Sequence, residues 1–302
     1  LPGLYGTLTI GADGSYTYDV DSTNAAVRAL RPGASLNDVF TYQLADTSGL
    51  TDLAQLVVRV NGVNDPPVAG NLTADAIEAG GVNNTTLGVD PSGNVRSVIT
   101  DPDGDVPTIT FIRPGPEATP GTDTPVAPTG DTIVAGAYGT LTIHADGSFT
   151  YVVNNANAAV QALRTDTDRL TDSFTYTAFD GVNGSDRGQI NVVIHGRNDY
   201  PVAADDNAAA QEAGGTLNQT PGVDPSGNVF ANDTDVDAGG QMFVIGARAG
   251  AGAAGGTFTG MVAGSSITIT GTYGSLVVFE NGNYQYQVNN NHAQVQALRP
   301  GP

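Results

Sequence analysis

The sequence predicts an all-β protein of tandem antiparallel β-sandwiches, each carrying one short helical turn. Three observations support this prediction. The motif Tyr5–Ile10 returns at Tyr138–Ile143 and at Tyr273–Val278, so starts are 133 and then 135 residues apart. Apolar residues alternate with polar ones at period two over most of the copied unit. Asp-Gly or Asn-Gly pairs separate many of these runs. A copied unit of this length is long enough to hold its own core.

Two proline-rich motifs mark the predicted domain boundaries. Asn64-Asp65-Pro66-Pro67 and Asn198-Asp199-Tyr200-Pro201 each follow the last strand of a copy. Proline fixes φ and removes a backbone donor, so each strand ends there in a short, stiff linker. Residues 1–64 are therefore the C-terminal part of a repeat, 65–198 a complete repeat and 199–302 the N-terminal part of a further repeat. The ends are out of phase with the repeat, which fits either cuts in a longer array or part-domains that complete each other between chains.

The predicted strands follow one another as hairpins. Asp13-Gly14, Asp146-Gly147 and Asn281-Gly282 lie between alternating runs, and such pairs supply the positive φ of a tight hairpin turn. The alternating apolar positions are Tyr16, Tyr18 and Val20; Phe40, Tyr42 and Leu44; Leu56, Val58 and Val60; Phe149, Tyr151 and Val153; Phe174, Tyr176 and Ala178; and Ile190, Val192 and Ile194.

Two kinds of segment interrupt the strands. Asn24–Leu30, copied at Asn157–Leu163 and His292–Leu298, predicts one or two helical turns, with Val27 and Leu30 facing the core. Residues 114–130 and 250–256 are rich in Gly, Ala and Pro and occupy equivalent parts of the repeat. They predict a loop or a poorly ordered insertion.

The composition limits the classes of function. The formal net charge is −20, and Asp outnumbers Glu by 27 to 4. Asp is typical of turns and of oxygen-ligand metal sites. No basic stripe is present to neutralise phosphates, which argues against a nucleic-acid partner. No run of 18 apolar residues predicts a membrane span.

Cysteine is absent from the chain. An extracellular protein without disulfides needs another source of stability, and a bound metal is one candidate. A chain exported unfolded would also avoid premature crosslinks. An ordinary cytosolic protein without Cys remains open on composition alone.

The best candidate site is a pair of acidic loops. They are Asp101-Pro102-Asp103-Gly104-Asp105 and Asp233-Thr234-Asp235-Val236-Asp237, with Asp101 aligned to Asp235 and Asp103 to Asp237. Alternate carboxylates in a loop point to one side, and calcium (Ca2+) takes six to eight oxygens at about 2.3–2.6 Å. The spacing is not that of an EF-hand, since the sixth position is Val106. A polar Asx-rich turn is the alternative, but several buried carboxylates without a cation would be costly.

Further candidate ligands lie near the boundaries. They are Asp65 and Asp199 in the linkers, and Glu78 and Glu212, each of which opens a Glu-Ala-Gly-Gly motif. Asp46, Asp52, Asp180 and Asp186 fit either a ligand role or a hairpin-turn role.

The sequence gives little support for catalysis, and we expect no enzymatic activity. His144, His195 and His292 are scattered, and no Gly-x-Ser-x-Gly motif is present. The alternating Tyr residues are better explained as core and cross-strand pairs than as a carbohydrate-stacking face.

The repeated motifs resemble a known family. Tyr138–Ile143 with Ala145–Tyr151, Leu170–Tyr176 and the closing Asn198-Asp199 look like the signature of VCBS-type repeats. Gly227–Asp237 resembles the opening of bacterial cadherin-like repeats. The resemblance implies cadherin-like or Ig-like sandwiches in giant bacterial surface adhesins or biofilm proteins, exported by type I secretion to the cell surface, with calcium between or within domains.

The main hypothesis is therefore a calcium-stiffened extender, or stalk, of an extracellular bacterial adhesin. Its partners would be adjacent repeats of the same chain. The alternative is a subunit of a self-assembling extracellular filament, in which neighbouring copies complete the terminal part-domains. A module that binds a glycan or ice is a third, weaker hypothesis.

Overall fold

The protein was analysed as a computed structural model that describes residues 1–81, 86–214, 219–252 and 257–299. Its contacts divide it into two compact units. Unit 1 comprises residues 1–78, 88–160 and 169–195, and unit 2 comprises residues 79–87, 161–168 and 196–302. The predicted boundaries at residues 64 and 198 stay predictions. No helix among the described residues has the length and apolar character needed to cross a membrane.

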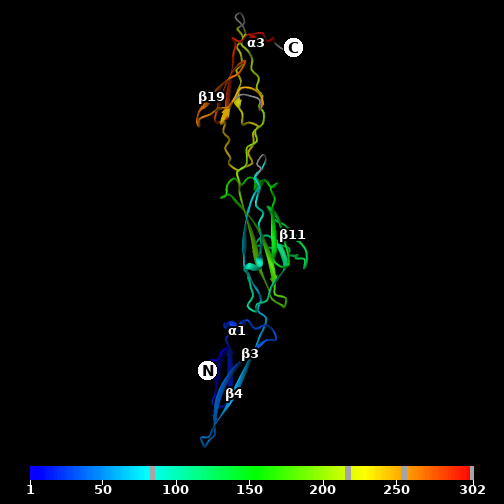
Figure 1. Ribbon diagram of the computed structural model, residues 1–302, viewed down its shortest axis with the longest axis vertical. Coiled ribbons are helices and arrows are strands. Elements are labelled where there is room, and N and C mark those ends of the chain that lie inside the picture. Colours follow the sequence, from blue (N-terminus) through cyan, green and yellow to red (C-terminus); the bar gives the residue numbers. More distant parts are fainter. Residues whose placement is uncertain (82–85, 215–218, 253–256, 300–302) are drawn as a thin grey trace. The chain divides into compact units, whose positions relative to one another are not determined.

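Unit 1 begins with two antiparallel hairpins (Figure 1). Strands β1 (Gly6–Ile10) and β2 (Tyr16–Val20) form the first. Helix α1 (Ala25–Arg28) leads to the longer hairpin of β3 (Ser35–Ala45) and β4 (Thr51–Asn61). The Tyr18 ring meets Phe40 edge-on, with centroids 6.0 Å apart, so the two hairpins share apolar contacts.

The rest of unit 1 forms two larger sheets. The first has the order β10-β9-β14-β15-β6, and the second has the order β11-β12-β13-β7. A short pairing of β5 with β8 stands beside them. The bounds are β5 Val68–Ala69, β6 Leu72–Ile77, β7 Ser92–Asn94, η1 Val95–Val98, β8 Ile99–Thr100, β9 Thr108–Pro114, β10 Thr124–Pro125, β11 Thr132–Ala135, β12 Gly139–Ile143, β13 Ser148–Val153, α2 Ala158–Gln161, β14 Arg169–Phe179 and β15 Ser185–His195.

The alternating residues of these strands build the core between the sheets. Phe149 and Tyr151 of β13 and Phe174 and Tyr176 of β14 are each at most 2% exposed. Tyr151 meets Phe174 edge-on at a centroid distance of 6.0 Å, repeating the Tyr18–Phe40 contact. The strands predicted from period-two alternation are thus present, and the all-β fold is confirmed.

One pairing differs from the antiparallel prediction. β15 pairs with β6 in parallel, from Ile190 opposite Leu72 to His195 opposite Ile77. β6 lies early in the predicted complete repeat and β15 lies at its end, so more than a hundred residues connect them. A parallel pair needs a long crossover, which this separation supplies.

The predicted hairpin turns are also present. Gly14, Gly147 and Gly282 have φ of 83°, 82° and 82°. In the complete repeat the Gly147 N–H donates to the His144 carbonyl at 3.0 Å, which closes the tight turn between β12 and β13. Such loops need one left-handed residue at this position, and glycine adopts it at no steric cost.

The motif Val89–Val95, which recurs without change at Val223–Val229, forms the edge of a sheet. In unit 1 its middle residues form β7, and the Asp90 Oδ1 atom accepts a hydrogen bond from the Val153 N–H at 2.8 Å. In unit 2 the Asp224 Oδ1 atom accepts from Val288 in the same way at 2.8 Å. The motif therefore has a structural role in both copies.

The helical turns form where the sequence predicts them. The Asn24 side chain caps α1 by accepting from the Ala26 N–H, and His292 caps α3 (Ala293–Gln296). Leu30 is buried, whereas Val27 is only half-buried. Leu298 is 65% exposed.

The insertion at residues 114–130 is more ordered than expected. β10 within it pairs with β9, and Arg113 lies beneath it with 3% exposure. The Arg113 guanidinium donates to the carbonyls of Thr119 at 2.5 Å and Glu117 at 2.9 Å, and pairs with Asp123 at 3.4 Å. Part of the second predicted insertion, residues 253–256, lies outside the described residues.

Unit 2 contains one four-stranded sheet of order β16-β21-β20-β19, together with a two-stranded pair, β17-β18. Tyr286 of β21 is half-buried, although its counterpart Tyr151 is fully buried. The bounds are β16 Ser226–Asn228, β17 Gly246–Ala247, β18 Thr259–Gly260, β19 Ser266–Thr270, β20 Gly274–Phe279 and β21 Asn283–Val288.

Candidate functional site

The first acidic loop, in unit 1, brings three carboxylates together. Ligand atoms of Asp101, Asp103 and Asp105 lie within 4.8 Å of one another. The Asp101 Oδ1 atom accepts from the Asp103 N–H at 2.9 Å and from the Asp105 N–H at 3.3 Å. Gly104 turns the chain with a φ of 74°. The loop is thus an Asx turn built on the Asp101 carboxylate.

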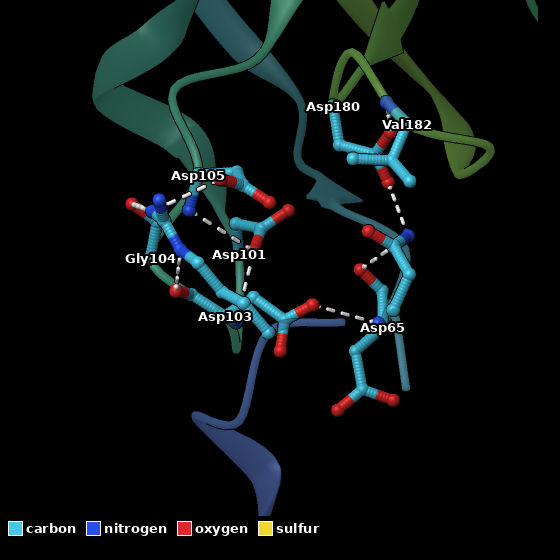
Figure 2. A network of polar contacts seen from close by, with 9 residues as sticks. Asp65, Asp101, Asp103, Gly104, Asp105, Asp180 and Val182 are labelled. Carbon is cyan, nitrogen blue, oxygen red and sulfur yellow. Dashed lines mark hydrogen bonds and ion pairs between the residues drawn. The ribbon is translucent and has the colours of Figure 1, made fainter. Parts of the chain in front are cut away.

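The linker Asn64-Asp65 lies against this loop (Figure 2). The Asp65 N–H donates to Asp103 Oδ2 at 2.9 Å. The Asn64 amide donates to Asp180 Oδ2 at 2.7 Å, which ties the linker to the turn between β14 and β15. The predicted ligands Asp101, Asp103 and Asp105 thus come together, whereas Asp65 reaches the loop through its backbone N–H, and its carboxylate is outside the three-carboxylate cluster.

Three side-chain oxygens at this place are buried and have no hydrogen-bond partner: Asp101 Oδ2, Asp103 Oδ1 and Asn64 Oδ1. A buried polar atom without a partner costs free energy, and unpaired carboxylates cost more. Burial raises the pKa of Asp101, and the charges of Asp105 and Asp103 add to the rise. All the donors are oxygens, as a hard cation such as calcium requires, so the residues present fit that ion.

The second acidic loop, in unit 2, repeats these contacts. The Asp237 N–H donates to Asp235 Oδ1 at 3.0 Å, and the Asp199 N–H donates to Asp237 Oδ2 at 2.8 Å. Asp237 Oδ1 is buried without a hydrogen-bond partner. Burial raises the pKa of Asp237, as do the charges of Asp199 and Asp235. The alignment of Asp103 with Asp237 therefore holds in three dimensions.

The two loops differ at one ligand position. Asp105 of the first loop corresponds to Gly239 of the second, so the second loop has one carboxylate fewer there. Asp233 stands two residues before Asp235, and its Oδ1 atom accepts from the Ala204 N–H at 2.8 Å. Among the described residues, only the first loop has three carboxylates whose ligand atoms all lie within 4.8 Å of one another.

The two glutamates take separate positions. Glu78 is fully buried after β6, where its N–H donates to the His195 carbonyl at 3.1 Å. This is the end of β6 opposite to the linker that carries Asp65. Glu212 is half-buried in unit 2 and accepts from the Gln296 amide at 2.9 Å. Neither belongs to the three-carboxylate cluster, and the last residue of the second Glu-Ala-Gly-Gly motif, Gly215, lies outside the described residues.

The four aspartates for which the sequence allows either a ligand role or a hairpin-turn role all accept hydrogen bonds from backbone N–H groups. Asp46 accepts from the N–H groups of Ser48 and Leu50, and Asp52 from that of Leu53. Asp180 caps its hairpin by accepting from the Val182 and Gly184 N–H groups, at 2.8 and 3.1 Å, as well as from Asn64. Asp186 accepts from the Ala69 N–H at 2.9 Å.

One cluster contains the residue types of a catalytic triad. His144 lies 2.9 Å from Asp131 and 3.2 Å from the Ser148 hydroxyl. However, the Ser148 hydroxyl is also 2.5 Å from Asp146 Oδ1, to which it donates. The Ser148 proton therefore points at a turn carboxylate and not at the imidazole. This geometry is that of a hairpin turn, not of an activated nucleophile.

Sequence reasoning missed two residues at the first loop. Asn64 offers a neutral oxygen there, and the recurrence of Asn-Asp at residues 64 and 198 was an available signal. Arg31 donates to the Asp103 and Gly104 carbonyls at 3.1 and 2.8 Å and pairs with Asp105 at 2.9 Å. Its recurrence as Ala-Leu-Arg after each helical turn was also visible.

Fold and site together define a repeat protein of β-sandwiches with acidic loops at the linkers. Residues 64–196 match the profile of the bacterial cadherin-like domain. This part of the chain is thus similar to a bacterial cadherin-like domain, and the predicted resemblance to cadherin-like repeats is confirmed.

Two individual proteins are also similar. The calcium-binding lectin RapA2 of Rhizobium johnstonii is 28% identical over 198 residues, which cover 65% of this chain and 74% of RapA2. A solved structure of extracellular cadherin domains 3–6 of protocadherin gamma B2 aligns with a TM-score of 0.40 and 10% identity. That alignment covers 97% of this chain and 60% of the protocadherin chain.

Proposed function

We propose that this chain is a structural extender, or stalk, of an extracellular bacterial adhesin or biofilm protein, and that calcium stiffens it. The coarser part of this proposal, an adhesion-related extracellular role without catalysis, is supported by the bacterial cadherin-like domain and by the likeness to a calcium-binding lectin. The finer part is our own inference from the acidic loops.

The observation that carries the proposal is the set of unsatisfied oxygens at the first loop. Asp101 Oδ2 and Asp103 Oδ1 are buried in a chain of net charge −20. Such a pair is unfavourable alone and favourable around a divalent cation. Asn64 Oδ1, from the linker, is likewise buried and lacks a hydrogen-bond partner.

A calcium ion would therefore join the linker to the loop. In the first site we assign Asp65, Asp101, Asp103 and Asp105 as ligands, and in the second Asp199, Asp233, Asp235 and Asp237. Glu78 and Glu212 stay proposed as additional ligands. An ion that binds only the folded state stabilises it, by about 2.7 kcal/mol when its concentration is 100 times the dissociation constant.

The same coupling supports folding outside the cell. We propose that the chain is exported unfolded, by a type I route, and that it folds where calcium is abundant. Metal-dependent folding and the lack of Cys are both compatible with such a route. Loss of surface protein after deletion of the dedicated exporter would test the route, and unchanged surface levels would contradict it.

Scanning calorimetry in excess chelator and in millimolar calcium tests the calcium proposal. We expect calcium to raise the melting temperature of the wild type. Asp103→Ala should lose most of this rise. Asp75→Ala removes the same charge from an exposed position on β6 and should keep it. Equal melting curves with and without calcium, or an equal loss in both variants, would refute the proposal.

A second candidate function has one observation in its favour. Unit 2 carries a groove of about 320 Å³ lined by residues that include Tyr273, Tyr286, Val288 and Leu298. In the complete repeat the counterpart of Tyr286 is covered by the β14-β15 hairpin. The equivalent β3-β4 hairpin of another copy would fit this groove, so we propose filament assembly as the alternative. Electron microscopy of the purified chain distinguishes the two: fibres favour assembly, and dispersed single particles favour the stalk.

A further inference from the structure

One arginine recurs at the same place after each helical turn, in the sequence Ala-Leu-Arg. The first two examples are Arg31 and Arg164. In each case the preceding leucine, Leu30 or Leu163, is buried, so the start of the arginine side chain is fixed. The guanidinium group then reaches away from its own repeat.

Arg31 holds the first acidic loop at three points, all within unit 1. Its Nε donates to the Asp103 carbonyl at 3.1 Å, and its Nη2 donates to the Gly104 carbonyl at 2.8 Å. The same Nη2 pairs with Asp105 Oδ1 at 2.9 Å. The partners lie more than seventy residues later in the sequence, beyond the Asn64-Asp65 linker.

Arg164 makes the corresponding contact within unit 2. Its Nη1 donates to the Gly239 carbonyl at 3.2 Å. A backbone bond from the Ala238 N–H to the Ala162 carbonyl, at 3.1 Å, lies beside it. Gly239 stands where the first loop has Asp105, one position after Ala238, which aligns with Gly104. Each arginine therefore donates to a carbonyl of the acidic loop, although not to the same one, and Arg164 does so where the carboxylate is absent. The recurring element is thus the arginine and the loop backbone, not the ion pair alone.

We infer that Arg31 and Arg164 are clasps that dock the end of one repeat's helical turn onto the acidic loop of the next repeat. The guanidinium donors are aimed at loop carbonyls, which carry no ionisable proton and need no metal to accept them. The clasp therefore holds the loop in place before any cation binds. It goes beyond the calcium proposal and does not depend on it.

The wild-type chain has no Cys, so two introduced cysteines can be spin-labelled specifically. Thr9→Cys and Val152→Cys, both at exposed strand positions, report across the first linker within unit 1. The width of their distance distribution is measured in excess chelator. We expect Arg31→Ala to broaden it by about twofold or more, because a charged multi-point contact is lost.

Arg59→Ala is the matched control, because Arg59 lies on β4 and, within the described part of the chain, donates to the Ser35 hydroxyl alone, at 2.9 Å. It should leave the distribution as in the wild type. Arg31 is 55% exposed, so its removal leaves the core intact, and circular dichroism checks this. Asp105→Asn, which keeps both carbonyl contacts, should broaden the distribution less than Arg31→Ala.

Hydrogen exchange tests the second clasp inside unit 2. Arg164→Ala should speed exchange of the Ala238 amide in chelator, and Arg31→Ala should not. An Arg31→Ala distribution as narrow as the wild type, or one matched by Arg59→Ala, overturns the inference. Because both measurements are made without calcium, they can fail or succeed independently of the calorimetric test.

Discussion

Asp172 shows how a single carboxylate can tie two sheets together. Its side chain is 4% exposed and accepts from the Tyr151 hydroxyl at 2.8 Å and from the N–H groups of Ala137 and Tyr138 at 3.1 and 3.0 Å. Asp38 repeats all of this with Tyr18, Leu4 and Tyr5. The Asp38 hydrogen bonds from Tyr5, Tyr18 and Leu4 outweigh the effect of burial and hold its pKa below the usual range.

Tyr151→Phe therefore removes one charge-assisted hydrogen bond without opening a cavity. Hydrogen bonds to charged groups contribute about 1.5–3 kcal/mol, so we expect urea unfolding of the complete repeat to shift by about that amount. The matched change Tyr18→Phe, at a half-buried ring, should shift its own transition less. Equal and negligible shifts for both variants would contradict this account of Asp172.

The acidic loop makes stability depend on pH in an unusual direction. Burial and the neighbouring carboxylates raise the pKa of Asp101, so the folded state binds this proton more tightly than the unfolded state does. In chelator, lowering the pH from 7 through the raised pKa toward about 3.9 should therefore stabilise the protein. Asp38 acts oppositely, because its pKa is lowered and its contribution is lost only at still lower pH.

With calcium bound, the same protonation should displace the ion and lower the melting temperature. Melting curves between pH 7 and pH 4.5, with calcium or chelator, check the change of sign. Asp101→Asn should reduce the acid stabilisation seen in chelator by the share of the first loop, and the share of Asp237 in the second loop should remain. A parallel decline in both conditions would show that these carboxylates do not control the response.

At the scale of elements, Arg113 explains why a Gly- and Pro-rich insertion is ordered. Its buried guanidinium donates hydrogen bonds to the carbonyls of both Glu117 and Thr119. Asp123 in turn pairs with Arg113 and with Arg187 at 3.4 and 2.5 Å. The Arg113 side chain thus holds the insertion in place through hydrogen bonds and an ion pair.

Arg113→Ala should release the insertion. We expect faster hydrogen exchange and faster proteolysis across residues 115–125, while the β14-β15 pairing keeps its protection. Arg187→Ala is the control, since this arginine is 40% exposed and contacts the segment only through Asp123. Similar proteolysis of both variants would assign the order of the loop to its backbone instead.

Local patterns predicted most of these elements, and long-range partners explain the rest. The alternation of Phe174, Tyr176 and Ala178 with polar residues predicts a strand, because successive side chains of a strand point to opposite faces of the sheet. The parallel register of β6 with β15 has no local signal, because residue periodicity does not encode strand direction. Likewise Asp101 and Asp103 were predictable from spacing, whereas Arg31 reaches them from a distant segment.

For the whole molecule, the net charge of −20 creates self-repulsion that any salt can screen. Screening and specific binding predict different results. Raising sodium chloride to about 0.5 M should stabilise the wild type and the Asp103→Ala variant alike, since the Debye length falls below about 5 Å for both.

Millimolar calcium adds little ionic strength. If it stabilises the wild type more than it stabilises the Asp103→Ala variant, calcium binds at a specific site. Magnesium, which keeps its waters and demands octahedral geometry, should stabilise the wild type less than calcium does. If sodium chloride reproduces the whole effect of calcium, the acidic loops act only through their bulk charge.

The parallel contact between β6 and β15 has a consequence under tension. The chain enters this sheet at Leu72 and leaves it at His195, and these residues lie at opposite ends of the paired segment. Pulling on the two ends of the repeat would slide the strands along each other. The hydrogen bonds from Leu72 to Ile77 would then be loaded together in shear, not opened one at a time as in a peeled hairpin. A sheet closed in this way resists extension best along the direction in which the chain runs.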